Sequence, residues 1–169
     1  LDLMIEFLYR QPKRNFVFNI YGITQDQYLT KMFSHKDILQ ELKNNVVFHG
    51  RKDSNAIQKA VARADFSFLI RSNNRTTTAG FSTKFVESIS CGTPVITTNT
   101  SDIAEYLLEG RNGFFLDFDP VVATNQLEKI LTLPREKVEE MKAYCRKNNP
   151  FYYGHFTERL GNFLESCMK

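Results

Sequence analysis

The sequence predicts an α/β fold in which a parallel β-sheet is doubly wound, with helices on both of its faces. Short apolar runs of strand length alternate along the chain with helical stretches. Several of these runs end at a glycine or lead into a polar loop, as strands do before a turn. The 169 residues, 42% of them hydrophobic and 24% charged, have the composition of one globular domain. A chain of this length can bury a substantial core, so a covered sheet is physically reasonable.

Five strands are expected, and each is an apolar run bounded by polar or turn-forming residues. The first two, FVFNIY and NVVFH, end directly before Gly22 and Gly50. Continuous apolar runs are typical of parallel strands that are buried on both faces. The expected strands cover residues 16–21, 45–49, 65–70, 95–98 and 112–117.

Helices are expected between and after these strands. Ser54 or Asn55 can cap the helix IQKAVARA, and Ser101 can cap the helix DIAEYLLEG. Residues 71–79, RSNNRTTTA, are expected to form a polar loop. The expected helices cover residues 1–9, 25–43, 57–64, 80–90, 102–110, 121–133, 136–147 and 151–169. With right-handed crossovers, these elements form a Rossmann-like domain.

Composition excludes several classes of protein. The net charge of +3 is small, and no basic stripe interleaved with aromatic residues marks a nucleic-acid binder. The cysteines, Cys91, Cys145 and Cys167, are widely spaced and form no CxxC pair, so a zinc site is not expected. Reduced thiols suit a cytoplasmic protein.

The chemistry is expected in residues 78–100, TAGFSTKFVESISCGTPVITTNT. Gly80 follows the polar loop, and a helix begins at once. The free backbone N–H groups of a first helical turn and the positive end of its dipole make an anion site, suited to a pyrophosphate. Ser82 and Thr83 can add hydroxyl donors, and Lys84 can supply a positive charge.

Glu87 lies one turn further along this helix, and its carboxylate has two possible roles. It can accept hydrogen bonds from both hydroxyls of a ribose, as acids do in other nucleotide-binding α/β domains. It can also form a surface ion pair with Lys84 at i, i+3. Spacing alone does not choose between these roles.

The segment GFSTKFVESISCGTPVI resembles the signature of the group 1 glycosyltransferases, which have two Rossmann-like domains in the GT-B architecture. The surrounding rhythm is similar as well: strands that end in Gly22 and Gly50, a helix ending ARAD, and TSDIAEYL before GRNGFFLD. The likeness covers residues 16–117. It implies that residues 1–169 form a single domain, the C-terminal, nucleotide-sugar-binding half.

The resemblance also assigns roles to individual residues. Glu87 is similar to the second glutamate of the family's pair, which holds the donor's ribose. The resemblance implies five further parts of the donor site. Gly80 and Phe81 face the transferred sugar, and the first-turn amides of Ser82 and Thr83 bind its phosphates, beside the charge of Lys84. The other three parts are the loop over the nucleotide (Thr98, Asn99 and Thr100), the edge where the base stacks (Gly50 and Arg51) and the loop at Gly22 on the phosphate side.

Two departures from the family pattern bear on catalysis. The first glutamate of the pair would fall at position 79, where this chain has Ala79. The family's basic phosphate clamp lies mostly upstream of residue 1, so it is not expected in this sequence. Arg71 or Arg75 could substitute for it, although a solvated loop arginine is the simpler interpretation. The sequence therefore assigns no catalytic residue.

The expected function is transfer of a sugar from a nucleoside diphosphate sugar to a glycan or lipid acceptor, with retention and without a metal or other cofactor. The partner is an absent N-terminal acceptor-binding domain, which residues 151–169 are expected to face. That domain would mediate any peripheral association with the inner face of a membrane, and this half is expected to be inactive alone. Two alternatives remain, namely a nucleotide-sugar epimerase of the same architecture and a degenerate, non-catalytic binding module. The base, the sugar, the acceptor and the oligomeric state are left open.

Overall fold

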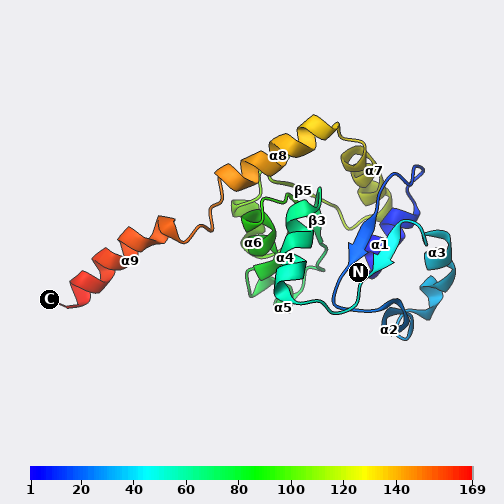
Figure 1. Cartoon of the computed structure of the whole chain (residues 1–169), viewed down its shortest axis with the longest axis horizontal. Coiled ribbons are helices and arrows are strands. Elements are labelled where there is room, and N and C mark those ends of the chain that lie inside the picture. Colours follow the sequence, from blue (N-terminus) through cyan, green and yellow to red (C-terminus); the bar gives the residue numbers. More distant parts are fainter. Residues whose placement is uncertain (169) are drawn as a thin grey trace.

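The computed structural model describes residues 1–168, in which short parallel strands alternate with helices (Figure 1). The α/β fold class and the order of strands and helices agree with the sequence. Each strand is shorter than expected, because only its central residues are in a hydrogen-bonded ladder. The strands are β1 (Phe18–Ile20), β2 (Val46–Phe48), β3 (Ser67–Leu69), β4 (Val95–Thr97) and β5 (Gly113–Phe115).

The strands form two parallel ladders rather than one continuous sheet. In the first ladder β1 pairs with β2, and Asn19 lies opposite Val47. In the second, β4 lies between β3 and β5. Within the described residues no ladder joins β1 to β3. The two ladders are connected there by side chains, with the rings of Phe18 and Phe68 meeting edge to face at 5.5 Å.

The helices surround both ladders, and most begin or end within a few residues of the expected positions. They are α1 (Asp2–Tyr9), α2 (Gln25–Leu29), η1 (Phe33–His35), α3 (Lys36–Glu41), α4 (Ser54–Arg63), α5 (Arg75–Thr78), α6 (Thr83–Ser90), η2 (Ser101–Glu105), α7 (Pro120–Leu131), α8 (Arg135–Lys147) and α9 (Gly154–Cys167). The expected helix 25–43 is therefore three short elements, in keeping with its weak apolar pattern.

Three local expectations were wrong, two of them because a neighbouring residue caps a helix. Asp53, not Ser54 or Asn55, caps α4 by accepting the Ala56 N–H at 2.9 Å. The polar stretch 71–79 contains the helical turn α5, because the Asn74 side chain accepts the N–H groups of Thr76 and Thr77.

The third wrong expectation concerns Ser101. Instead of capping an α-helix over 102–110, it is the first residue of the 3₁₀ helix η2, and its φ of +53° is in the left-handed region. A non-glycine residue has a steric cost there, so the backbone at the start of η2 is strained.

Two of the three core clusters in the described residues include residues of α1. Met4, Phe7 and Leu8 pack with Leu127 and Ile130 of α7 in one cluster. Ile5, on the same broad buried face of the helix, packs with residues of α2, α3 and β2 in a second cluster. A third cluster includes residues of α6 and β4. Because α1 contributes to two clusters, this helix joins the first ladder to the rest of the molecule.

The last helix, α9, stands apart from this body and points away from it (Figure 1). None of its residues is buried. Its apolar side chains recur at i, i+4 and i+7 in Phe156, Leu160 and Phe163, which are all more than half exposed. Lys169, the last residue of the expected terminal helix, lies outside the described residues. No helix in residues 1–168 has the length and apolar character needed to cross a bilayer.

Candidate functional site

The loops that follow β1 and β2 meet at the carboxyl ends of these strands. The Gly22 N–H donates to the Gly50 carbonyl at 2.8 Å. Both residues have positive φ angles, +93° for Gly22 and +63° for Gly50, which glycine adopts without the steric cost of a Cβ. The two loops predicted to line the phosphate and base sides of a donor site are therefore joined by their backbones, with exposed Arg51 directly after them.

His49, the last residue before Gly50, contacts two residues of the first strand and the loop after it. Its ring stacks on Tyr21 with centroids 4.5 Å apart and planes 10° from parallel. Its Nε2 atom lies 2.7 Å from Asn19 Oδ1, within hydrogen-bond distance. These contacts account for His49 as a structural residue that fixes the strand ends.

The first turn of α6 is open to solvent or a ligand. Ser82 is its N-cap and is buried, but its side chain makes no capping hydrogen bond. By contrast, α4 and α7 are capped by the carboxylates of Asp53 and Asp119. Gly80 and Thr83, on either side of the turn, are exposed. The backbone N–H groups of this turn thus remain without a side-chain acceptor, at the positive end of the helix dipole.

Glu87 and Lys84 form the ion pair that spacing allows. Lys84 Nζ lies 3.9 Å from Glu87 Oε2, and the side chains are 75% and 60% exposed. An exposed pair at i, i+3 contributes less than about 1 kcal/mol. Such a weak pair leaves both side chains able to turn toward a ligand.

The residues after β4 differ sharply from one another. The Thr98 hydroxyl accepts the Arg71 N–H at 2.9 Å and donates to the Arg71 carbonyl at 2.7 Å, so it holds the loop after β3. Asn99 is exposed. Thr100 is 2% exposed, and among the described residues its hydroxyl is a buried side-chain oxygen without a hydrogen-bond partner. Leaving such a group unpaired costs about 1–3 kcal/mol, which a ligand donor or acceptor would recover.

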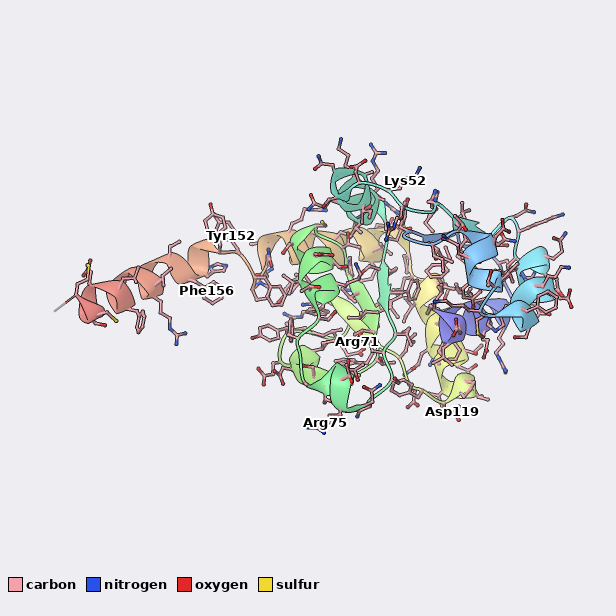
Figure 2. The ribbon with its side chains drawn as sticks, turned by 90° about the horizontal axis from the view of Figure 1, so that it is seen from below. Lys52, Arg71, Arg75, Asp119, Tyr152 and Phe156 are labelled. Atoms are coloured by element: carbon pink, nitrogen blue, oxygen red, sulfur yellow. The ribbon has the colours of Figure 1, made fainter. Side chains whose placement is uncertain are left out.

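Positively charged residues follow several strand ends. Lys52 comes after β2, and Arg71 and Arg75 come after β3; all three are labelled in Figure 2. Arg75 is exposed and begins α5, which lies against η2. The segments after β3 and β4 are therefore neighbours, as a site shared between them requires.

Phe81 lies in an aromatic cluster that the sequence did not predict. The cluster consists of Phe81, Phe85, Tyr106 and Phe151, with Phe81 5.2 Å from Tyr106 and 5.7 Å from Phe151. The ring of Phe81 therefore packs against protein, and its backbone and that of Gly80 border the open turn. No sequence pattern relates these four residues, because the chain brings Tyr106 and Phe151 to α6 from distant elements.

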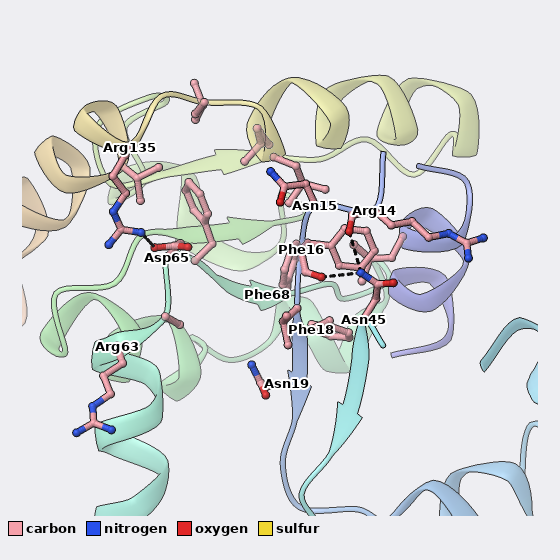
Figure 3. Close-up of a pocket in the computed structure, with 18 of the residues that line it drawn as sticks. Arg14, Asn15, Phe16, Phe18, Asn19, Asn45, Arg63, Asp65, Phe68 and Arg135 are labelled. Carbon is pink, nitrogen blue, oxygen red and sulfur yellow. Dashed lines mark hydrogen bonds and ion pairs between the residues drawn. The ribbon is translucent and has the colours of Figure 1, made fainter. Parts of the chain in front are cut away.

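A cavity of about 800 Å³ lies elsewhere, between β1 and β3 at their amino ends (Figure 3). Its walls include Phe16 and Phe68, and at its edge Arg135 forms an ion pair with Asp65 at 2.5 Å. The guanidinium groups of Arg14 and Arg63 point away from its centre (Figure 3). None of the predicted donor-binding residues lines this cavity, which is the space left where the two ladders separate.

Neither the cysteines nor the acidic residues suggest a second chemistry. Burial raises the pKa of the Cys145 thiol to about 12, and burial followed by the charge of Glu87 raises the pKa of Cys91. Both thiols are therefore protonated at neutral pH. In the part of the chain that the structure describes, no three His, Cys, Asp or Glu side chains gather as metal ligands.

The family of the chain follows from this site and a comparison with known families. The family model of the group 1 glycosyl transferases matches residues 1–148, so this chain belongs to that family. The match includes both ladders and the open turn of α6, and it ends before α9. No curated protein sequence matches the chain significantly.

Solved structures with the same fold are glycosyltransferases of the GT-B architecture. Anabaena HepE in complex with UDP is 17% identical with a TM-score of 0.71, over 98% of this chain and 44% of that chain. Sucrose-phosphate synthase from Thermosynechococcus elongatus is 15% identical with a TM-score of 0.70, over 99% of this chain and 42% of that chain. The chain thus spans less than half the length of these proteins.

Proposed function

We propose that this chain binds a nucleoside diphosphate sugar at the carboxyl ends of its strands and serves as the donor-binding half of a retaining glycosyltransferase. The observation that carries the proposal is the open first turn of α6. Its N–H groups and dipole favour a diphosphate, which would take the place of the missing side-chain cap. Membership of the group 1 family favours a transferase over an epimerase of similar architecture.

The surrounding residues then take complementary parts in donor binding. Glu87 leaves its weak pair with Lys84 and accepts hydrogen bonds from the ribose hydroxyls. Lys84 is released toward the phosphates, where its charge counters that of the leaving group. The unpaired hydroxyl of Thr100 is buried, so a polar group of the nucleotide would reach it only if the segment after β4 shifted. The joined loops at Gly22 and Gly50, with Arg51, border the base and the phosphates.

Uridine diphosphate is the first nucleotide to test, since HepE has been solved with UDP and with UDP-glucose. We expect no metal requirement, because the helix N–H groups and Lys84 stabilise the developing phosphate charge in place of a cation. The acceptor half would supply the second wall of the cleft and the acceptor contacts. We therefore expect no sugar transfer by residues 1–169 alone.

Substitution of Glu87 tests the proposal. Glu87→Ala removes the charged acceptor of the ribose and should weaken UDP binding by about 1–3 kcal/mol, or roughly 5- to 150-fold in Kd, in isothermal titration calorimetry. The matched control is Glu140→Ala, because Glu140 forms the same kind of exposed i, i+3 pair with Lys137 on α8. This control should leave Kd unchanged.

The outcomes of this experiment separate the parts of the proposal. Equal Kd values for wild type and Glu87→Ala would show that Glu87 does not bind the ribose and only pairs with Lys84. Loss of binding on addition of EDTA would show a metal requirement and contradict the proposed phosphate site. Sugar transfer by this chain alone would contradict the need for an acceptor half.

A further inference from the structure

The segment that joins α8 to α9, residues 148–153, is attached to both ends of the donor-site helix α6. At one end the Asn149 Nδ2 group donates to Ser90 Oγ, on the last residue of α6, at 3.3 Å. At the other end the ring of Phe151 packs against Phe81 and Phe85, with centroids 5.7 and 6.0 Å away. We call residues 148–153 the connector.

The connector is itself held in shape by local hydrogen bonds. The Phe151 N–H donates to Asn149 Oδ1 at 3.0 Å, so one side chain fixes both the contact with Ser90 and the backbone at Phe151. His155 Nε2 lies 3.2 Å from the Asn149 carbonyl, at the start of α9. The position of the Phe151 ring therefore follows from a short, hydrogen-bonded stretch.

Few other contacts restrain the open turn before α6. Ala79 and Gly80 are exposed, and Ser82 does not cap the helix. The half-buried ring of Phe81 is thus the main anchor of the turn, and it rests on fully buried Phe85. Phe151 contacts both of these rings and also Tyr106, at 5.2 Å, so it completes the packing around Phe81.

We propose that Phe151 is a positioning residue of the donor site, whose packing on Phe81 and Phe85 fixes the backbone of residues 80–84. What the turn binds rests on the function proposed above. The family match ends at residue 148, so all of the connector after its first residue lies outside the part of the chain that the match covers. The helix α9 begins at Gly154, directly after the connector.

Three variants test this role, with the backbone ¹³Cα chemical shifts of residues 80–84 as the first readout, because these shifts follow φ and ψ rather than the ring current of a neighbouring aromatic side chain. Phe151→Leu removes the ring but keeps an apolar side chain, and Phe151→Tyr keeps the ring. Phe163→Leu makes the same change as the first variant on exposed α9, where the side chain is 62% exposed. Without nucleotide, Phe151→Leu should move the ¹³Cα shifts of residues 80–84, whereas the other two variants should leave them close to wild type.

UDP affinity is the second readout, measured below the unfolding transition of every variant. The loss of aromatic contacts should weaken UDP binding by about three- to tenfold in Phe151→Leu, and Phe151→Tyr should restore it. A structural role alone would lower the melting temperature without changing these ¹³Cα shifts or Kd, and that result would overturn the proposal. If wild type binds no UDP, the proposed function fails, and the ¹³Cα shifts alone still decide the role of Phe151.

Discussion

At the scale of single residues, two side chains with the same expected role differ in their hydrogen bonding. Thr98 and Thr100 were both predicted to lie over the nucleotide. The hydroxyl of Thr98 is already engaged with the Arg71 backbone, whereas that of Thr100 is buried and unpaired. The sequence could predict that these threonines follow a strand. It could not predict which hydroxyl stays unpaired, because that depends on contacts with a loop about thirty residues away.

The glycines were more predictable than the threonines. Gly22 and Gly50 each follow an apolar strand, and both were expected in turns; their positive φ angles confirm this. Ser101 also has a positive φ angle, but it is not a glycine, so the sequence did not predict a left-handed conformation there. A glycine in the sequence therefore predicts a left-handed backbone conformation, whereas the same conformation at a residue such as serine has no sequence signal.

The cysteines give a prediction at this scale. Because burial raises the pKa of Cys145 to about 12 and also raises that of Cys91, their reactive thiolate forms appear only at higher pH than usual. Cys167 is exposed near the end of α9. At pH 8 we expect iodoacetamide to label Cys167 first, as followed by peptide mass spectrometry, with Cys145 labelled only after denaturation. Equally rapid labelling of Cys145 in the folded protein would contradict this burial.

At the scale of helices and strands, the order of elements was predictable but their contacts were not. Apolar periodicity identified the strands and most helices, because it reports which residues face a core. It carries no information on which distant elements touch. The aromatic cluster joins α6, η2 and the connector, and the two ladders separate between strands that are not consecutive in the chain.

A buried lysine illustrates such a contact between helices. Lys142 of α8 is 5% exposed, and its Nζ group donates to the carbonyls of Ala62 and Ala64 at 3.1 and 2.6 Å. It thereby satisfies the carboxyl end of α4, where helix carbonyls lack partners. Lys142→Met should lower the free energy of unfolding by about 1–3 kcal/mol, because two partly buried carbonyl contacts lose a charged donor.

Chemical denaturation measures this loss, and Lys137 supplies its control. Lys137 lies on the same helix but is exposed and paired with Glu140. Lys137→Met should change the free energy of unfolding by less than about 0.5 kcal/mol. Similar values for the two variants would mean that the contact with α4 contributes nothing beyond a surface lysine.

At the scale of the whole molecule, α9 presents the main apolar surface that packs against nothing in the described residues. Its exposed apolar side chains lack a partner within the described residues, and the GT-B proteins of the same fold are more than twice as long. The sequence predicted this apolar excess and assigned it to a facing domain. We propose that such a domain covers α9 in a longer chain, which would place the connector near the boundary between the two halves.

Isolated from such a partner, this surface should promote association. We expect the mass from light scattering to rise with protein concentration over the micromolar range, because an apolar patch of this kind is buried when copies meet. Replacing Phe156, Leu160 and Phe163 by serine should keep the protein monomeric at the same concentrations. An unchanged rise in mass in the triple variant would exclude α9 as the contact surface.

The break between β1 and β3 also affects how the molecule opens. No hydrogen-bonded ladder joins β1 to β3 within the described residues, and side chains such as Phe18 and Phe68 make the contact there. We therefore expect amide protons of the β1–β2 ladder to exchange with solvent through local openings in which β3, β4 and β5 stay protected. Gly22, Gly50 and Arg51 lie at the ends of the first ladder, whereas α6 packs against β3 and β4 of the second. A nucleotide that spans both ladders would couple their openings, so that its binding would be recorded as slower deuterium uptake along β1 and β2.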